Sequence, residues 1–290
     1  MKILQTILFI LIAVSAYSQR FDDVVIKTHE VAEGIHMLEG AGGNIGIFAG
    51  DDGVLMIDGQ FSDLSEKIKA AINEISNHPV KYLVNTHWHG DHTGGNANFA
   101  KDGATIIANH EVRKRLTADQ VRPFGRTTPA ADTLAWPTIS FGEDLEIHMN
   151  GESVQLMHVH NAHTDGDSFV YFPKANVLHM GDCFFKDRFP YIDLEMGGSV
   201  AGAIAAIEAA MMIIDEETMI IPGHGSMANK EDLRRYLAMI NTTRDRVNNV
   251  TSEDTKLEDL DVESLTEGYK DWGGGFIDGE KWIGTLFRGR

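Results

Sequence analysis

Apolar and polar residues recur along the chain with the periods of short strands and amphipathic helices. Near the N-terminus, apolar runs separated by the turn sequences "GAGGN" and "GDDG" predict strands at 34–39, 44–48 and 54–57. The stretch 62–76 has apolar residues at helical spacing, with Ser62 as the expected N-cap. These apolar residues are Leu64, Ile68, Ile72 and Ile75. The run "VKYLVNT" at 80–86 then predicts a buried strand.

The rest of the chain repeats this alternation of strands and helices. Further strands are expected at 104–108, within 138–159, at 167–172, at 176–180 and at 218–224. Helices are expected at 110–116, 199–214 and 230–250, with a turn and helix within 269–287. The proline-containing stretch 117–138 is expected to be a loop that borders a pocket. Mixed strands and helices of this kind predict an α/β fold.

The first 18 residues have the anatomy of a secretory signal peptide. Lys2 precedes an apolar run, and the stretch "AYS" ends at Ser18, where we expect cleavage. The apolar run is much shorter than the roughly 20 residues that a membrane-spanning helix needs. Residues 19–290 are therefore expected to form a single domain that is periplasmic or secreted and has no membrane-spanning part.

Composition narrows the possible partners. The formal net charge of −18 argues against a nucleic-acid partner, because phosphate binding needs clustered Lys and Arg side chains. Cys183 is the sole cysteine, so an intramolecular disulfide is excluded. The expected partner is a small-molecule substrate, and the oligomeric state is left open.

Side chains that can bind metal stand at or just beyond the ends of five predicted strands. They are Asp58, His87, His163, Asp182 and His224. Open α/β sheets place ligands at the carboxyl ends of their strands, so these residues are expected to meet at one edge of a sheet.

The densest group is the run "HWHGDH" at 87–92, which follows a predicted strand directly. A catalytic zinc needs three protein ligands and an open position. His87 and His89 suit one metal, while Asp91 and His92 suit a neighbouring one. A histidine-rich turn that binds metal only adventitiously is the weaker interpretation of this spacing.

This run resembles the signature of the metallo-β-lactamase superfamily. Four other landmarks of that family occur in the expected order along the chain: "MIDG" with Asp58 before this run, and "AHTDGD" with His163, "MGDC" with Asp182 and "PGHG" with His224 after it. The resemblance covers almost the whole chain after the signal peptide. It implies a four-layer αββα sandwich with a metal site at one edge of the paired sheets.

The resemblance also implies two zinc ions per chain. The implied ligands are His87, His89 and His163 for the first ion and Asp91, His92 and His224 for the second. Asp182 resembles the carboxylate that bridges the pair. Asp58 resembles an aspartate that orients the histidine loop through outer hydrogen bonds.

The implied activity is that of an exported binuclear zinc hydrolase. A metal-bound hydroxide attacks a carbonyl carbon, and one zinc stabilises the oxyanion. Asp91 is the expected catalytic residue, because it accepts a hydrogen bond from the nucleophile and assists proton transfer to the leaving group. The expected substrate is a β-lactam-like amide, a lactone or an ester.

Two other functions remain open. A glyoxalase II-like thioesterase is the first, although the tail after His224 has no obvious basic patch for a glutathione or nucleotide moiety. A zinc-binding protein without turnover is the second, and the complete ligand set counts against it. The short turn "GAGGN" counts against a true lactamase, since many lactamases have a longer apolar flap there.

Several residues have two interpretations. Cys183 and Lys186 match the spacing at which some lactamases bind zinc and the substrate carboxylate, but Asp182 is preferred as the ligand. His158 and His160 are interpreted as packing or outer residues rather than ligands. Five aromatic residues are interpreted as packing residues rather than specificity determinants: Trp88, Phe124, Trp136, Phe185 and Tyr191. The native metal is also left open.

Overall fold

The computed structural model describes residues 21–122 and 127–290. The predicted signal peptide at 1–18 lies outside the described residues, as does Phe124. Among the described residues, no helix has the length and the apolar character that crossing a bilayer requires.

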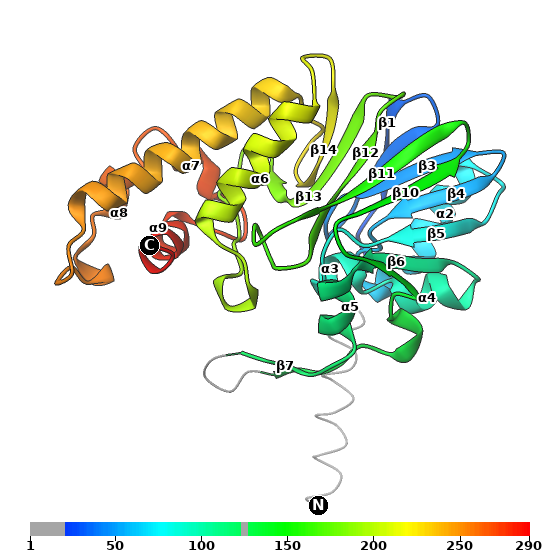
Figure 1. Ribbon diagram of the computed structural model, residues 1–290, viewed down its shortest axis with the longest axis horizontal. Coiled ribbons are helices and arrows are strands. Elements are labelled where there is room, and N and C mark those ends of the chain that lie inside the picture. The colour runs from blue at the N-terminus through cyan, green and yellow to red at the C-terminus, as the bar shows by residue number, and fades with distance from the viewer. Residues whose placement is uncertain (1–20, 123–126) are drawn as a thin grey trace, which may run out of the picture.

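Two sheets form the centre of the molecule (Figure 1). Within the described residues, the first sheet has seven strands in the order β1-β2-β3-β4-β5-β6-β9. The strands β1 to β4 are antiparallel neighbours, and β4, β5, β6 and β9 run parallel. Their bounds are β1 (Lys27–Ala32), β2 (Ile35–Glu39), β3 (Ile45–Gly50), β4 (Gly53–Ile57), β5 (Val80–Val84), β6 (Thr105–Asn109) and β9 (Ile139–Phe141).

The second sheet has five strands within the described residues, in the order β10-β11-β12-β13-β14. All neighbours are antiparallel except β13 and β14, which are parallel. Their bounds are β10 (Asp144–Met149), β11 (Glu152–Val159), β12 (Asp167–Phe172), β13 (Val177–Phe185) and β14 (Met219–His224). A separate short hairpin pairs β7 (Gln120–Val121) with β8 (Thr127–Thr128).

Helices lie on the outer faces of both sheets and at one edge of the sandwich, where Figure 1 shows α3 and α5. Their bounds are α2 (Ser65–Ile75), α3 (Gly90–Thr93), α4 (Asn96–Lys101), α5 (His110–Leu116), α6 (Val200–Ile213), α7 (Lys230–Val250), α8 (Val262–Leu265) and α9 (Gly279–Arg288). Short 3₁₀ turns are η1 (Ser62–Leu64), η3 (Thr133–Ala135), η4 (Leu194–Met196), η5 (Leu257–Asp259) and η6 (Lys270–Gly274).

Three apolar layers hold the four layers of structure together. Between the sheets, side chains such as Leu55 of β4 pack with Val170 of β12. Outside the first sheet, Ile68 of α2 packs on the apolar outer face of the strands. Outside the second sheet, α6, α7 and α9 bury a larger core that includes Trp282. This arrangement confirms the predicted αββα sandwich, because each sheet buries both faces.

Two local predictions are wrong. Ser62 does not cap the predicted helix: its hydroxyl donates to Asp63, and the turn η1 precedes α2. The strand predicted at 176–180 continues to Phe185, so Asp182 lies within β13 rather than beyond its end. The register of β13 is irregular on both sides of Gly181, where φ is +50°. This irregularity turns the strand locally, which sequence alternation does not reveal.

Candidate metal centre

The seven predicted ligands meet at one edge of the sandwich. His87 and His89 follow β5, and Asp91 and His92 lie on α3, the short helix that comes next. From the other sheet, Asp182 lies on β13, while His163 lies in the loop between β11 and β12 and His224 ends β14. The seven side chains form two groups. Within each group, the candidate ligand atoms all lie within 4.8 Å of one another.

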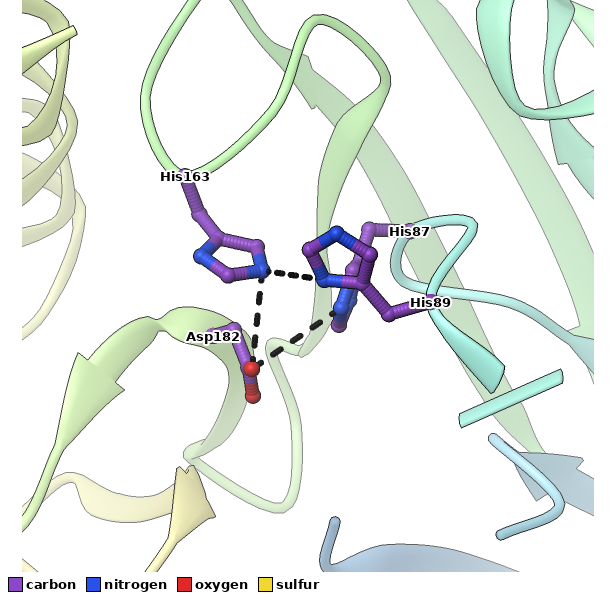
Figure 2. A group of neighbouring side chains, drawn as sticks. All are labelled: His87, His89, His163 and Asp182. Carbon is purple, nitrogen blue, oxygen red and sulfur yellow. Dashed lines mark hydrogen bonds and ion pairs between the residues drawn. The ribbon is translucent and has the colours of Figure 1, made fainter. Parts of the chain in front are cut away.

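The first group consists of His87, His89, His163 and Asp182 (Figure 2). His163 Nε2 lies 2.8 Å from His89 Nδ1. Asp182 Oδ2 lies 3.5 Å from His163 Nε2 and 3.8 Å from His87 Nε2. Three imidazole nitrogens and one carboxylate oxygen therefore face the same small region between these side chains.

The second group consists of Asp91, His92 and His224. His224 Nε2 lies 3.4 Å from Asp91 Oδ2, and His92 Nε2 lies 3.7 Å from the same oxygen. The side chains of Asp91 and His224 are 31% and 20% exposed, so solvent reaches this group.

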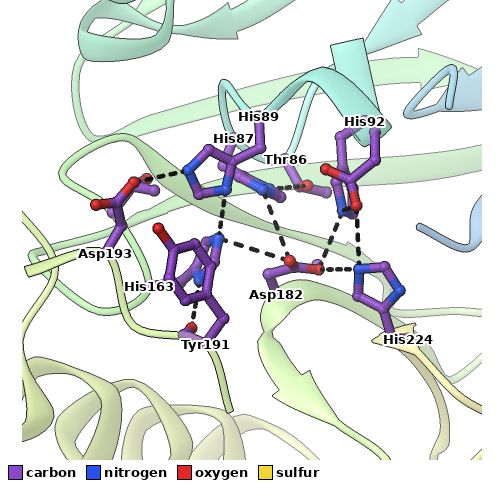
Figure 3. Close-up of polar contacts among 12 residues, drawn as sticks. Thr86, His87, His89, His92, His163, Asp182, Tyr191, Asp193 and His224 are labelled. Carbon is purple, nitrogen blue, oxygen red and sulfur yellow. Dashed lines mark hydrogen bonds and ion pairs between the residues drawn. The ribbon is translucent and has the colours of Figure 1, made fainter. Parts of the chain in front are cut away.

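Asp182 lies between the two groups (Figure 3). While its Oδ2 faces the first group, its Oδ1 lies 3.1 Å from His92 Nε2 and 3.5 Å from His224 Nε2. Gly223 permits this position, because a Cβ there would lie 2.0 Å from Asp182 Oδ1. One carboxylate therefore contacts both groups, as a bridging ligand would.

Hydrogen bonds on the outer sides of the rings fix which nitrogen is free in the first group. His163 Nδ1 donates to the Tyr191 carbonyl at 2.6 Å, and His89 Nε2 donates to Asp193 at 2.9 Å. A neutral imidazole has one donor and one acceptor nitrogen. When both rings are neutral, the two nitrogens that face each other at 2.8 Å are therefore both acceptors, and a shared cation would relieve this contact.

The same arrangement holds for His87 and His92. His92 Nδ1 donates to Asp58 at 2.8 Å, and His87 Nδ1 lies 3.1 Å from the Thr86 hydroxyl. Their inner atoms, and Asp182 Oδ1, are buried without a hydrogen-bond partner in the described part of the chain. Buried polar atoms are rarely left unpaired. The donor set of imidazole nitrogens and carboxylate oxygens fits a divalent metal such as zinc.

Asp58 forms hydrogen bonds with the loop that carries the histidines, residues 86–92. It is fully buried, follows β4 and has a φ of +63°. Its two oxygens accept hydrogen bonds from the Thr86 backbone at 2.8 Å, the Thr86 hydroxyl at 2.7 Å and His92 Nδ1. The predicted orienting role of Asp58 is confirmed by these contacts.

The electrostatics of the centre favour positive charge between the groups. Burial opposes ionisation of Asp182, but His92, His224 and His87 hold the pKa of its carboxyl well below the usual range. Burial likewise opposes ionisation of Asp91, yet His92 and His224 lower its pKa to about 2. Burial lowers the pKa of His87 and His89 and favours the neutral imidazole that binds metal. Burial also opposes protonation of His92 and His224, but Asp182 and the neighbouring carboxylates raise the pKa of His92 well above its ordinary value and that of His224 to about 9.

Three further residues hold the histidines of the first group in position from outside the group: Asp193, Arg122 and Tyr191. The sequence did not predict this role for any of them. Asp193 accepts from His89 and forms a two-pronged ion pair with Arg122 at 2.7 and 3.0 Å. The Tyr191 carbonyl orients His163. Asp193 and Arg122 are 71 residues apart and have no motif spacing, so no signal in the sequence connects them to His89.

Cys183 lies outside both metal-binding groups. Its side chain is buried in the core under α6 and α7, on the strand position next to Asp182. Burial and the nearby Asp167 carboxyl raise the pKa of this thiol well above its ordinary value. Lys186 forms an ion pair with Asp232 of α7, so its charge is already matched.

His158 and His160 have partners away from the centre. His158 contacts the Asp167 carbonyl at 2.9 Å, and His160 contacts the Glu143 carboxylate at 3.0 Å. Their rings lie 4.3 Å apart. Neither residue belongs to the two groups: His158 packs near the end of β11, whereas His160 lies exposed just beyond that strand rather than inside it.

The aromatic residues differ in their distance from the centre. Trp88 is buried among apolar side chains, and Trp136 packs against the same cluster. Phe185 stacks on His224 at a centroid distance of 5.3 Å. Tyr191 lies 5.6 Å from the rings of both His89 and His163. Phe185 and Tyr191 thus adjoin the centre itself, as does Trp88, whose ring centroid lies 4.9 Å from that of His89.

A family model described as "Metallo-beta-lactamase superfamily" matches residues 38–224. That span contains all seven residues of the two groups. The match agrees with the resemblance that the motifs indicated, and the residues after 224 lie outside it.

Individual relatives share only part of their length with this chain. The 2,4-dinitroanisole O-demethylase subunit alpha of Nocardioides sp. is 33% identical over 47% of this chain and 39% of its own. A hydroxyacylglutathione hydrolase of Erythrobacter litoralis is 32% identical over 37% of this chain and 35% of its own. The chain thus spans less than half the length of these curated relatives.

Solved structures share the fold at low identity. A metallo-beta-lactamase from Pontibacter korlensis superposes with a TM-score of 0.61 at 16% identity, covering 74% of this chain and 99% of the other. This likeness concerns the fold alone. The similarity to a hydroxyacylglutathione hydrolase supports the prediction of a metal-dependent hydrolase.

Proposed function

Because this chain belongs to the metallo-beta-lactamase superfamily, we propose that it is an exported hydrolase that binds two zinc ions and cleaves a small carbonyl compound. The observation that carries the proposal is the position of Asp182. Its two oxygens face two separate groups of donors, at 3.5 Å from His163 and 3.1 Å from His92.

Each donor has a defined part in the proposed centre. His87, His89 and His163 would hold one ion; Asp91, His92 and His224 would hold the other, and Asp182 would contact both. Bound there, the two ions would lower the pKa of a water molecule and polarise a carbonyl oxygen. Zinc is proposed because imidazole and carboxylate donors suit it.

Asp91 is the proposed catalytic residue of the chain itself. The neighbouring histidines lower its pKa to about 2, so the carboxylate is ionised at neutral pH. Its side chain is also the more exposed partner in its contact with His92. It is thus placed to accept a hydrogen bond from the attacking water, to take up the proton that the water loses on attack, and to pass that proton to the leaving group.

The proposed substrate is a β-lactam-like amide, a lactone or an ester. The second candidate is a thioester, which the similarity to a hydroxyacylglutathione hydrolase favours. Export after removal of residues 1–18 remains part of the proposal. Mass spectrometry of the secreted or periplasmic protein, isolated from cells that express the full chain, tests it: an N-terminus at residue 19 is expected.

The test of the activity is a substrate panel on protein of known metal content. We expect about two zinc ions per chain and hydrolysis of at least one chromogenic β-lactam, lactone or ester. Thioester hydrolysis without the others selects the second candidate. Protein that holds two zinc ions and cleaves none of the four classes is a zinc-binding protein, and the hydrolase proposal is then wrong.

The ligand assignment is tested by two neighbouring substitutions on one strand. Asp182→Ala removes the carboxylate shared by both groups, so the zinc content is expected to fall below one per chain. Cys183→Ser is the matched control and is expected to keep two, since its side chain lies in the apolar core. The opposite result assigns the metal to the thiol.

A further inference from the structure

An exposed aromatic side chain lies beside the candidate metal centre. Phe276 is 76% exposed, and its ring meets the Tyr191 ring edge-on at a centroid distance of 5.8 Å. Tyr191 in turn lies 5.6 Å from the rings of His89 and His163. Only one ring therefore separates Phe276 from the first group of the centre.

The exposure of Phe276 is imposed by an anchored segment. The next residue, Ile277, is buried in the core that α9 and α7 share. On the other side, the Trp272 carbonyl accepts a hydrogen bond from the Phe189 backbone at 3.0 Å. Lys281 of α9 donates to the Phe276 carbonyl at 2.8 Å, and its ammonium lies 5.3 Å from the Phe276 ring centroid. The fold thus holds this ring in water.

Isolated apolar residues are common on protein surfaces. Met212 of α6 is one example, at 81% exposure. Phe276 differs because a second aromatic ring connects it to a group of metal-binding side chains. It also comes from the part of the chain after residue 224, which lies outside the family match.

We propose that Tyr191 and Phe276 form an aromatic subsite, and that it selects substrates whose carbonyl group carries an aromatic ring. This inference rests on the proposed function, since the subsite matters only if the centre binds the substrate. Aromatic rings prefer offset or edge-to-face contacts with one another. The edge-on pair leaves the Phe276 ring available for such a contact with a ligand.

The subsite is tested by ligand binding rather than by turnover. The protein is loaded with cobalt(II), and the visible absorption of the bound ion is followed during titration with phenylmethanethiol or ethanethiol. The two thiols share a metal-binding sulfur and differ in the aromatic ring. Wild-type protein is expected to bind the aromatic thiol more tightly.

Phe276→Ala is expected to weaken phenylmethanethiol binding about five- to tenfold, the size of one aromatic contact. Ethanethiol binding is expected to change less than about twofold, as are both affinities in the control Met212→Ala. Phe276→Leu, which keeps the apolar surface, is expected to be intermediate. Thermal unfolding of each variant verifies that the fold is intact.

The outcomes distinguish the two proposals. If Phe276→Ala binds both thiols like the wild type, while cobalt binding and hydrolysis persist, the aromatic subsite is wrong and the proposed function stands. If metal-free wild-type protein takes up neither cobalt nor zinc, the proposed function is wrong, and the subsite proposal fails with it.

Discussion

At the residue scale, the orientation of His89 depends on a carboxylate from a distant segment. Asp193 accepts the His89 Nε2 proton at 2.9 Å and is itself held by Arg122. Asp193→Ala removes this acceptor, so we expect metal affinity to fall about 10- to 100-fold. Competition with a chromophoric chelator measures the affinity.

The variant Asp193→Asn is the control for this prediction. Its amide oxygen still accepts from His89, so a much smaller loss is expected. Equal affinities for the alanine variant and the wild type mean that packing alone orients His89.

A glycine next to the second group is a further test at this scale. A Cβ at Gly43 would lie 2.0 Å from His92 Cε1, while a Cβ at Gly90 would meet nothing within 4 Å. Gly43→Ala is therefore expected to displace His92 and lower the metal content, whereas Gly90→Ala keeps it. The metal content of both variant proteins tests this prediction. A Gly43→Ala protein with the full metal content contradicts it and shows that the turn before β3 can shift to make room for the added methyl group.

At the element scale, the C-terminal helix α9 is anchored through one tryptophan. Trp282 is fully buried, and its Nε1 donates to the Thr243 hydroxyl of α7 at 3.0 Å. Trp282→Ala is expected to lower the free energy of unfolding by about 3–5 kcal/mol, because it leaves a large cavity. Urea denaturation measures the change.

Phe276→Ala serves as the comparison for Trp282→Ala. Its side chain is mostly in solvent, so a change within about 0.5 kcal/mol is expected. A similar loss for both variants indicates that the loop before α9 contributes to stability beyond its visible contacts.

At this scale, sequence periodicity located most elements but not their exact ends. The helix expected from Ser62 begins after a 3₁₀ turn, and β13 extends past Met180 to Phe185. Strand ends depend on pairing with a neighbour. β13 continues because the parallel strand β14 accompanies it as far as His224.

At the scale of the whole molecule, the candidate centre joins the two sheets. His87, His89, Asp91 and His92 follow a strand of the first sheet. Asp182 and His224 lie on strands of the second sheet, and His163 lies in a loop between two of its strands. A metal that binds only the folded chain stabilises it by mass action. Removal of metal is therefore expected to lower the unfolding temperature.

Differential scanning calorimetry tests this coupling. Excess zinc at roughly 100 to 1,000 times its dissociation constant is expected to add about 3–4 kcal/mol to the stability of the metal-free protein. Asp182→Ala protein, which lacks the shared carboxylate, is expected to gain much less from added zinc. An unfolding temperature that does not respond to zinc or to chelator contradicts metal binding at this centre.

The sequence by itself determined the mixture of strands and helices, because period-2 and period-3.6 patterns are local. The layered fold and the seven ligands followed from the resemblance of its motifs to a known superfamily, and the histidine motif alone contains four of the seven. Each remaining residue stood in a short motif of its own.

Only the tertiary structure decided how those side chains are held. Asp193, Arg122 and Tyr191 reach the histidines from segments with no motif, and Phe276 reaches Tyr191 from the C-terminal part of the chain. Such contacts depend on how loops return across the sheet edge. They are non-local, so no spacing along the chain encodes them, and the carboxylate of Asp182 meets both groups only because two sheets pack face to face.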